Sequence, residues 1–137
     1  MRKSTFSLTV RGYELDGFGH VNNSVYLQYG ETAIWNFFQK SDLLKYLEEA
    51  GVFPVISESS QRYLHELKLL DEVQIDSEFT CSDYLVTYKH KVKNKNTNVI
   101  SCVIKGKFGF VDKKERIICD IPAAIKEYIE SDPDDNK

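Results

Sequence analysis

The chain has few cysteines, no long hydrophobic run and no long run of basic residues, and each shortage excludes a class of protein. Its three cysteines are Cys81, Cys102 and Cys119. None belongs to a CxxC pair, and no histidine lies at zinc-ligand spacing from any of them. A disulfide framework and a structural zinc site are therefore not expected. We predict free thiols that fill small apolar spaces in a reducing compartment.

No hydrophobic run is long enough to span a bilayer, and no apolar signal-peptide core follows Met1. We therefore expect no membrane span and a cytoplasmic protein. The formal net charge is only −3 and the basic residues are scattered, which argues against nucleic acid as the partner. What the chain does have is 42% hydrophobic residues over 137 positions. This predicts one domain with its own core over residues 1–130, followed by a polar tail over residues 131–137.

The spacing of the apolar residues changes along the chain. Phe6, Leu8 and Val10 alternate with polar residues, which predicts a half-buried strand. From about Asn23 to Gln39 the spacing becomes three and four, which predicts a helix. Its main apolar face carries Tyr26, Tyr29, Gly30, Ala33 and Phe37, and Leu27, Ile34, Trp35 and Phe38 widen that face almost all round. We expect an enclosed helix. Gly30 either lets its backbone approach a sheet or is simply tolerated.

The remainder of the chain is mostly strand-like. Ser41 and Gly51 are expected to bound a short second helix. Period-two segments then follow over residues 55–69, 73–81, 86–92, 100–110 and 116–121, with turns between them. Pro122 is placed to open a terminal helix through Ile129. A helix followed by antiparallel strands predicts an α+β fold, with one sheet wrapped around the long helix. The edge strands of such a sheet favour a homodimer or homotetramer.

The segment from Asp16 to Asn23 carries the chemistry. It places a carboxylate and the His20 imidazole in a glycine-rich loop directly before the long helix. Backbone amides at a helix N-terminus suit a developing negative charge. A loop of this composition therefore indicates a reactive site as well as a connection.

This arrangement resembles the hotdog-fold thioesterases, and within them the hydroxybenzoyl-CoA and acyl-CoA thioesterase group. The resemblance rests on Asp16-Gly17-Phe18-Gly19-His20-Val21, followed by Tyr26-Leu27 and then by Glu31. The form His20-Val21-Asn22-Asn23 is also similar to the acyl carrier protein thioesterases of plants and bacteria. The resemblance extends from Thr5 to about Ile129. Glu66 stands where the family often has proline, Asn23 where one branch has histidine, and Phe18 where plant enzymes have asparagine.

The resemblance makes Asp16 the catalytic carboxylate, as a general base or a nucleophile. The alternative is an Asx-turn residue that orders the loop. His20 is expected either to assist catalysis, since an imidazole can exchange a proton near neutral pH, or to anchor backbone carbonyls. The amides around Gly19, Val21, Asn22 and Asn23 are expected to hold the thioester oxygen, while the side chains of Asn22 and Asn23 cap the helix.

Other charged residues are secondary candidates. Glu31 is a possible second acid, or otherwise a solvated or interface carboxylate. Lys113, Lys114 and Arg116 flank a hairpin and could contact the phosphates of coenzyme A, although such hairpins are usually only solvated. His90 is expected to be a hydrogen-bonded core residue.

The function implied is hydrolysis of an acyl thioester to a carboxylic acid. No metal and no redox cofactor is expected, and coenzyme A or acyl carrier protein enters as part of the substrate. One alternative is a module of the same fold that binds acyl thioesters without turnover. A dehydratase is a second alternative, but its motif ends in Gly-Pro, and that pair does not occur in this chain.

Overall fold

The structure is a computed structural model that describes residues 1–131 of the chain. The described elements follow in the order β1 (Arg2–Thr9), η1 (Gly12–Glu14), α1 (Asn23–Lys40), α2 (Leu44–Ala50), β2 (Val52–Tyr63), β3 (Glu72–Ser82), β4 (Leu85–Asn94), β5 (Ile100–Asp112), β6 (Ile118–Cys119) and α3 (Ala123–Glu130). All of the predicted tail except Ser131 lies outside the described residues.

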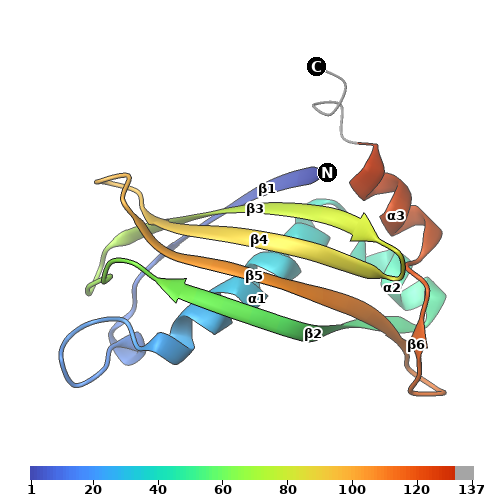
Figure 1. The fold of residues 1–137 in the computed structure, drawn as a ribbon, viewed down its shortest axis with the longest axis horizontal. Coiled ribbons are helices and arrows are strands. Elements are labelled where there is room, and N and C mark those ends of the chain that lie inside the picture. Colours follow the sequence, from blue (N-terminus) through green and yellow to red (C-terminus); the bar gives the residue numbers. More distant parts are fainter. Residues whose placement is uncertain (132–137) are drawn as a thin grey trace.

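One antiparallel sheet curves around α1 (Figure 1). The strand order is β1-β3-β4-β5-β2, and the short β6 pairs with β5. The loop before α1 lies at one end of the sheet, and the β5–β6 hairpin lies at the opposite end (Figure 1). This is the α+β architecture that the sequence predicts.

Most element predictions are confirmed, and four need correction. Ser41 is the C-cap of α1 and does not begin α2, which starts without a side-chain cap, whereas Gly51 ends α2 in the left-handed conformation as expected. The strand predicted over residues 55–69 begins at Val52 and ends at Tyr63. The strand predicted over residues 116–121 is only Ile118–Cys119. The long helix is not enclosed all round, because Leu27 and Trp35 are each 42% exposed.

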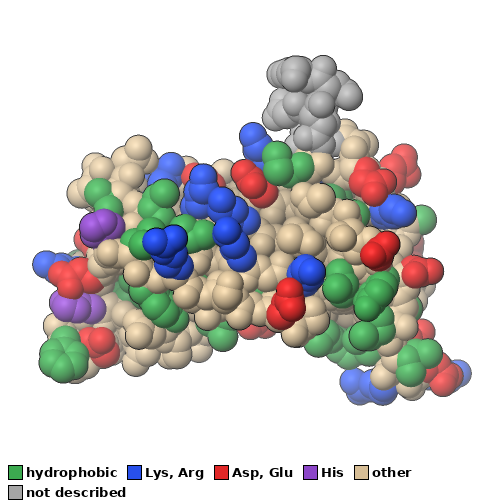
Figure 2. All heavy atoms as spheres, viewed as in Figure 1, with side chains coloured by type: hydrophobic (Ala, Val, Ile, Leu, Met, Phe, Trp, Pro, Cys, Tyr) green, Lys and Arg blue, Asp and Glu red, His purple; other side chains and the backbone are tan. Residues whose placement is uncertain are grey.

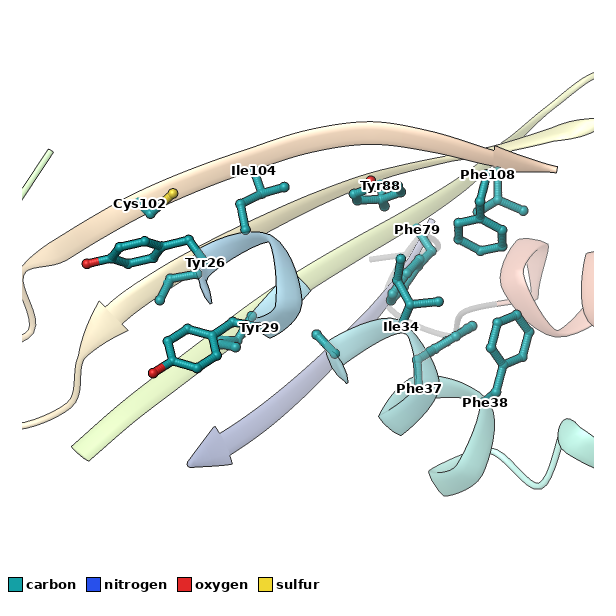
Figure 3. Close-up of a cluster of buried hydrophobic side chains, with 14 of the residues drawn as sticks. Tyr26, Tyr29, Ile34, Phe37, Phe38, Phe79, Tyr88, Cys102, Ile104 and Phe108 are labelled. Carbon is teal, nitrogen blue, oxygen red and sulfur yellow. The ribbon is translucent and has the colours of Figure 1, made fainter. Parts of the chain in front are cut away.

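The core lies between α1 and the concave face of the sheet (Figure 3). Side chains from α1 meet inward rows from β3, β4 and β5; those labelled in Figure 3 are Tyr26, Tyr29, Ile34, Phe37, Phe38, Phe79, Tyr88, Cys102, Ile104 and Phe108. Phe37 stacks on Phe79 with ring centroids 4.1 Å apart. Cys102 is fully buried as a free thiol, in keeping with its predicted role as apolar filling.

Gly30 brings the backbone of α1 close to the sheet. A Cβ atom at this position would lie 3.2 Å from His90 Cδ2 and 3.2 Å from Ile104 Cδ1. These distances are tighter than ordinary van der Waals contact, so the close-approach explanation for Gly30 is confirmed. The position of the helix relative to the sheet, and hence of its N-terminus, is set by this contact.

The sheet leaves two edges unpaired within the described chain, those of β1 and β2. The free edge of β2 is long. Val55 on this strand is exposed and lines a groove with the exposed Trp35 of α1. None of the described helices is long and apolar enough to cross a membrane.

His90 is fully buried in the middle of the sheet, as predicted for a core histidine. Its Nδ1 is 2.7 Å from Ser77 Oγ, and its ring stacks on Tyr88. Burial lowers the pKa of His90 from its ordinary 6.5 to about 4. The folded protein therefore holds this imidazole neutral at pH values where the unfolded chain already binds a proton.

This predicts a specific loss of stability in mild acid. The contribution of His90 to stability is complete above pH 6.5 and falls as the pH drops toward 4, by roughly 2–4 kcal/mol in total. The measurement is the free energy of unfolding in urea at several pH values. His90→Gln should flatten the dependence between pH 6.5 and 4, whereas His65→Gln should not. Equal slopes in the wild type and His90→Gln would contradict this account.

Candidate active site

The segment between η1 and α1 folds into a tight, well-bonded loop. Leu15 and Val21 pair across its base, and the Asp16 N–H donates to the His20 carbonyl at 2.7 Å. Gly19 has φ +81°, a conformation that glycine adopts without steric cost. The glycine-rich composition therefore provides a closed loop with fixed side chains.

Asp16 orders this loop with one carboxylate oxygen. Its Oδ1 accepts the N–H of Phe18 at 2.8 Å and the N–H of His20 at 3.2 Å. These bonds form the Asx-type turn given as the alternative role. The other oxygen, Oδ2, accepts no hydrogen bond from the described residues, and Asp16 lines a surface pocket. The geometry therefore gives Asp16 a structural role and leaves one oxygen free for chemistry.

The backbone amides of the loop are mostly engaged. Those of Gly19, His20, Val21 and Asn22 donate to Asp16 O, Asp16 Oδ1, Leu67 O and Glu14 O respectively. Asn22 Oδ1 accepts the Ser24 N–H at 3.0 Å and caps α1, as predicted. The amide of Asn23, the first residue of α1, donates to no described residue. Of the amides predicted to hold the thioester oxygen, only that of Asn23 has no hydrogen-bond partner among residues 1–131, and its role as an oxyanion donor stays a prediction.

Glu14 is a buried carboxylate that ties the two ends of the loop together, and no sequence pattern marks it. It is only 4% exposed. Its Oε1 accepts the Arg11 N–H at 2.7 Å and the Tyr29 hydroxyl at 2.8 Å, and its Oε2 lies 2.7 Å from Arg11 Nη2. Burial raises the pKa of Glu14, but the hydrogen bonds from Arg11 and Tyr29 outweigh burial, so the net pKa lies below its ordinary value.

The His20 ring pairs with Glu66 and not with Asp16. His20 Nε2 lies 2.7 Å from Glu66 Oε2, and both side chains are partly exposed. Glu66, which stands where the family often has proline, therefore contacts a candidate site residue. No local pattern links the two residues, because they meet only when the 64–71 segment folds back along the loop. That segment is held by the Val21 N–H bond to the Leu67 carbonyl.

These groups share one pocket of about 250 Å³ at the N-terminal end of α1. Its lining residues are Asp16, His20, Val21, Asn23, Tyr26, Tyr63, Leu64, His65 and Glu66. The Tyr63 hydroxyl donates to the Asn23 carbonyl at 3.2 Å, and its ring meets Tyr26 edge-on. Burial raises the pKa of Tyr26 to about 12, so this phenol stays neutral at physiological pH. Within one chain, the pocket therefore brings a free carboxylate oxygen, an imidazole and a helix N-terminus together.

Glu31 lies two turns further along α1 and does not reach this pocket. It is exposed and lines a separate groove of about 300 Å³ with Ile34, Trp35, Pro54, Val55, Ile56 and Phe108. Among these residues it is the only charged one. Its predicted role as a second acid stays a prediction.

Lys113, Lys114 and Arg116 lie on the β5–β6 hairpin, at the end of the sheet opposite the loop (Figure 1). The chain therefore does not bring these residues to the pocket. Asp112 Oδ1 accepts the Lys114 N–H at 2.9 Å, and the Arg116 guanidinium lies over the Phe53 ring. Their contact with coenzyme A phosphates stays a prediction. No cluster of three metal-ligating side chains occurs within residues 1–131.

Comparison with known proteins places the chain in a family. The family model described as "Thioesterase-like superfamily" matches residues 10–129. The chain belongs to this superfamily. The long-chain acyl-CoA thioesterase FadM of Escherichia coli K12 is 32% identical over 71 residues, which are 52% of this chain and 54% of FadM. The match therefore spans about half the length of each protein.

Solved structures share the fold. The Escherichia coli protein YbaW superposes with a TM-score of 0.82 at 22% identity, covering 92% of this chain and 96% of that one. A 1,4-dihydroxy-2-naphthoyl-CoA thioesterase from Synechocystis superposes with a TM-score of 0.86 at 15% identity, covering 95% and 97%. At these identities the likeness shows the hotdog fold alone, and the predicted fold is confirmed.

The buried Glu14 network predicts a large effect of a small change. Glu14→Gln removes the charge that binds Arg11, so the free energy of unfolding at pH 7 should fall by about 2 kcal/mol. Glu48→Gln, an exposed change on α2, should cost less than about 0.5 kcal/mol. Because the pKa of Glu14 is lowered, its contribution is present above its ordinary pKa and is lost as the pH falls below it. Urea titration of both variants at pH 7 and pH 4 measures this. A Glu14→Gln variant as stable as the control at pH 7 would rule the network out as the loop's anchor.

Proposed function

We propose that the protein hydrolyses acyl-CoA thioesters to carboxylic acids at the pocket beside the N-terminus of α1. One observation carries this proposal: Asp16, which keeps one carboxylate oxygen free of hydrogen bonds from the described residues, lines the same pocket as Asn23, whose helix N-terminal amide is unengaged. Membership of the thioesterase-like superfamily supports the reaction class. The curated relative is an acyl-CoA thioesterase, which favours coenzyme A over acyl carrier protein as the carrier.

The chemistry needs a group that activates a nucleophile and a group that stabilises negative charge. In one route, Asp16 Oδ2 takes a proton from a water molecule while the water oxygen attacks the carbonyl carbon. In the other route, Asp16 Oδ2 attacks that carbon itself, and water then hydrolyses the acyl-enzyme. The Asn23 N–H and the positive end of α1 hold the oxyanion, and one such donor is worth roughly 3–4 kcal/mol in the transition state. The C–S bond then breaks, and the thiolate takes up a proton.

His20 assists in this scheme and does not act as the base. Glu66 holds its Nε2 at 2.7 Å, which fixes the ring beside the pocket. From this position the imidazole orients water or supplies the proton to the leaving thiolate.

The apolar groove between α1 and β2 suits the acyl group. Asn23 lines the first pocket, and Ile34 and Trp35 line the groove. Ile34 is eleven positions after Asn23, which is about 16 Å along α1. Because the groove runs along the unpaired edge of β2, a second copy of the chain at this edge would cover it. We therefore include a homodimer or homotetramer in the proposal.

Asp16→Asn tests the mechanism without removing the loop's hydrogen bonds, because the asparagine Oδ1 can still accept the Phe18 and His20 amides. We expect kcat on an acyl-CoA panel to fall at least about 100-fold with an unchanged melting temperature. Asp83→Asn, in the β3–β4 turn, is the matched control. Its φ of +56° suits asparagine, and its activity should stay at the wild-type level.

The outcomes separate the alternatives. Wild-type rates in Asp16→Asn would contradict the assigned role of the carboxylate. Tight acyl-CoA binding with no turnover by the wild type would identify a binding module instead of an enzyme.

A further inference from the structure

A short polar stretch of β2 lies between the pocket and the apolar groove. Residues directly opposite each other in a sheet share a face, so the pairing with the inward residues of β5 defines the concave row of β2. From the pocket outward, this row consists of Tyr63, Gln61, Ser59, Ile56 and Pro54. Tyr63 lines the pocket, whereas Ile56 and Pro54 line the apolar groove. Gln61 and Ser59 therefore lie on the way from one to the other.

A β-bulge keeps Ser59 and Ile56 on the same face. The pairing of β2 with β5 shifts between Ile56 and Glu58, so Ser57 is the extra residue. The Ser57 hydroxyl donates to the Lys107 carbonyl at 3.2 Å. Side chains alternate along a regular strand, so without the extra residue positions 56 and 59 would point to opposite faces. The bulge therefore joins the polar part of the row to its apolar part.

Gly106 admits a third polar group, the Tyr88 hydroxyl, to this row. Gly106 pairs with Tyr88 on one side and with Ser59 on the other. A Cβ atom at Gly106 would collide with the Tyr88 hydroxyl. The Tyr88 ring lies across β5 in the gap between Ile104 and Phe108 (Figure 3). Its hydroxyl forms a hydrogen bond with the Ser59 side chain.

The side chains of Gln61, Ser59 and Tyr88 form one network with unused hydrogen-bonding capacity. Gln61 Nε2 donates to Ser59 Oγ at 2.5 Å. Gln61 Oε1 accepts no hydrogen bond from residues 1–131, although it can accept two. Tyr88 is buried, whereas Gln61 is half-buried and Ser59 is exposed. A bound molecule can therefore reach Gln61 and Ser59, with Tyr88 behind them.

Glu31 gives the surroundings of this network a negative charge. Burial raises the pKa of Tyr88, and the nearby Glu31 carboxylate raises it further. A second carboxylate on a bound molecule would be repelled here, whereas a neutral donor finds acceptors. A plain alkyl chain would exclude water and leave Gln61 Oε1 unpaired, which is unfavourable. The chemistry of the network therefore favours a hydroxyl group.

The place of the network along β2 sets the position of that hydroxyl. Tyr63 marks the pocket, because its hydroxyl donates to the Asn23 carbonyl at 3.2 Å. Gln61 and Ser59 are two and four residues from Tyr63, which is about 7 and 14 Å along the strand. The apolar part of the row begins only after them, at Ile56. The hydroxyl therefore belongs in the middle of an acyl chain, with apolar carbons on its far side.

We propose that the preferred acyl group carries a hydroxyl group on a mid-chain carbon, and that Gln61 and Ser59, supported by Tyr88, bind this hydroxyl. The proposal rests on the proposed function for the positions of the thioester carbonyl and of the last carbons of the chain. It makes the concave row of β2 the part of the site that selects the substrate.

The test compares dodecanoyl-CoA with its 3-hydroxy, 8-hydroxy and 12-hydroxy derivatives. We expect kcat/KM for the 8-hydroxy derivative to exceed that for dodecanoyl-CoA at least about tenfold, because only its hydroxyl reaches the network. The other two derivatives should stay within about twofold of dodecanoyl-CoA. In Ser59→Ala/Gln61→Leu, the ratio for the 8-hydroxy derivative should fall to within about twofold of one. Both side chains are accessible, so the melting temperature should stay close to that of the wild type.

Ser60→Ala is the matched control. Ser60 follows Ser59 on β2 but pairs with Lys105, so its side chain lies on the outer face of the sheet. Figure 2 shows charged side chains on that face. The control should keep the substrate preference of the wild type.

Three outcomes would overturn the proposal. The first is a wild-type ratio near one for all three derivatives. The second is an 8-hydroxy preference that Ser59→Ala/Gln61→Leu retains. The third is a stronger preference for an amino group at the same carbon that is lost in Glu31→Gln, which would replace the hydroxyl by an ammonium group.

Calorimetry with the free acids keeps this result separate from the proposed function. The wild type could hydrolyse no thioester yet bind 8-hydroxydodecanoic acid at least about tenfold more tightly than dodecanoic acid. If Ser59→Ala/Gln61→Leu removes that difference, the polar network stands and the hydrolase fails. If thioesters are hydrolysed but neither kcat/KM nor Kd depends on the hydroxyl, the network fails alone.

Discussion

The buried carboxylate of Glu14 is the interaction on which the loop depends. It binds the backbone and the guanidinium of Arg11 before the loop and the Tyr29 hydroxyl on α1, and its own carbonyl accepts the amide of Asn22 after the loop. Both ends of the loop are thus tied to the helix. The helix is in turn placed by Gly30 against His90 and Ile104. Core packing therefore sets the position of Asp16. The free carboxylate oxygen takes part in none of the hydrogen bonds that order the loop.

Three hollows of different chemistry lie on the molecule, two of them at this loop and one further along α1. An apolar groove follows α1 and the free edge of β2, a polar groove passes over Ser101, and a small pocket with Asp16, His20 and Asn23 lies between them. In the proposed function, the apolar groove takes the acyl group and the pocket takes the reactive carbonyl.

The sequence predicts the elements better than the contacts. Period-two and period-three-to-four patterns locate every strand and the long helix, because each buries one face, and Gly30 marks the close approach. Ser41 fails as a predicted cap because α1 runs to Lys40 and uses Ser41 as its own end. Asp16 and His20 are recognisable in one motif. Glu66 is not, because it meets His20 only through folding of the chain. Glu14 is not recognisable either, because nothing in the sequence distinguishes it from a surface glutamate. Among the loop amides, those of Gly19 and His20 are bound locally by Asp16, whereas that of Val21 binds the Leu67 carbonyl, a tertiary contact that no spacing encodes.

The most direct measurement is a crystal structure of the wild-type protein with an acyl-CoA analogue in which a methylene group replaces the thioester sulfur. The account predicts the analogue's carbonyl oxygen about 2.7–3.2 Å from the Asn23 amide nitrogen, with the carbonyl carbon facing Asp16 Oδ2. A carbonyl bound away from the N-terminus of α1, with Asp16 turned from it, would contradict the account.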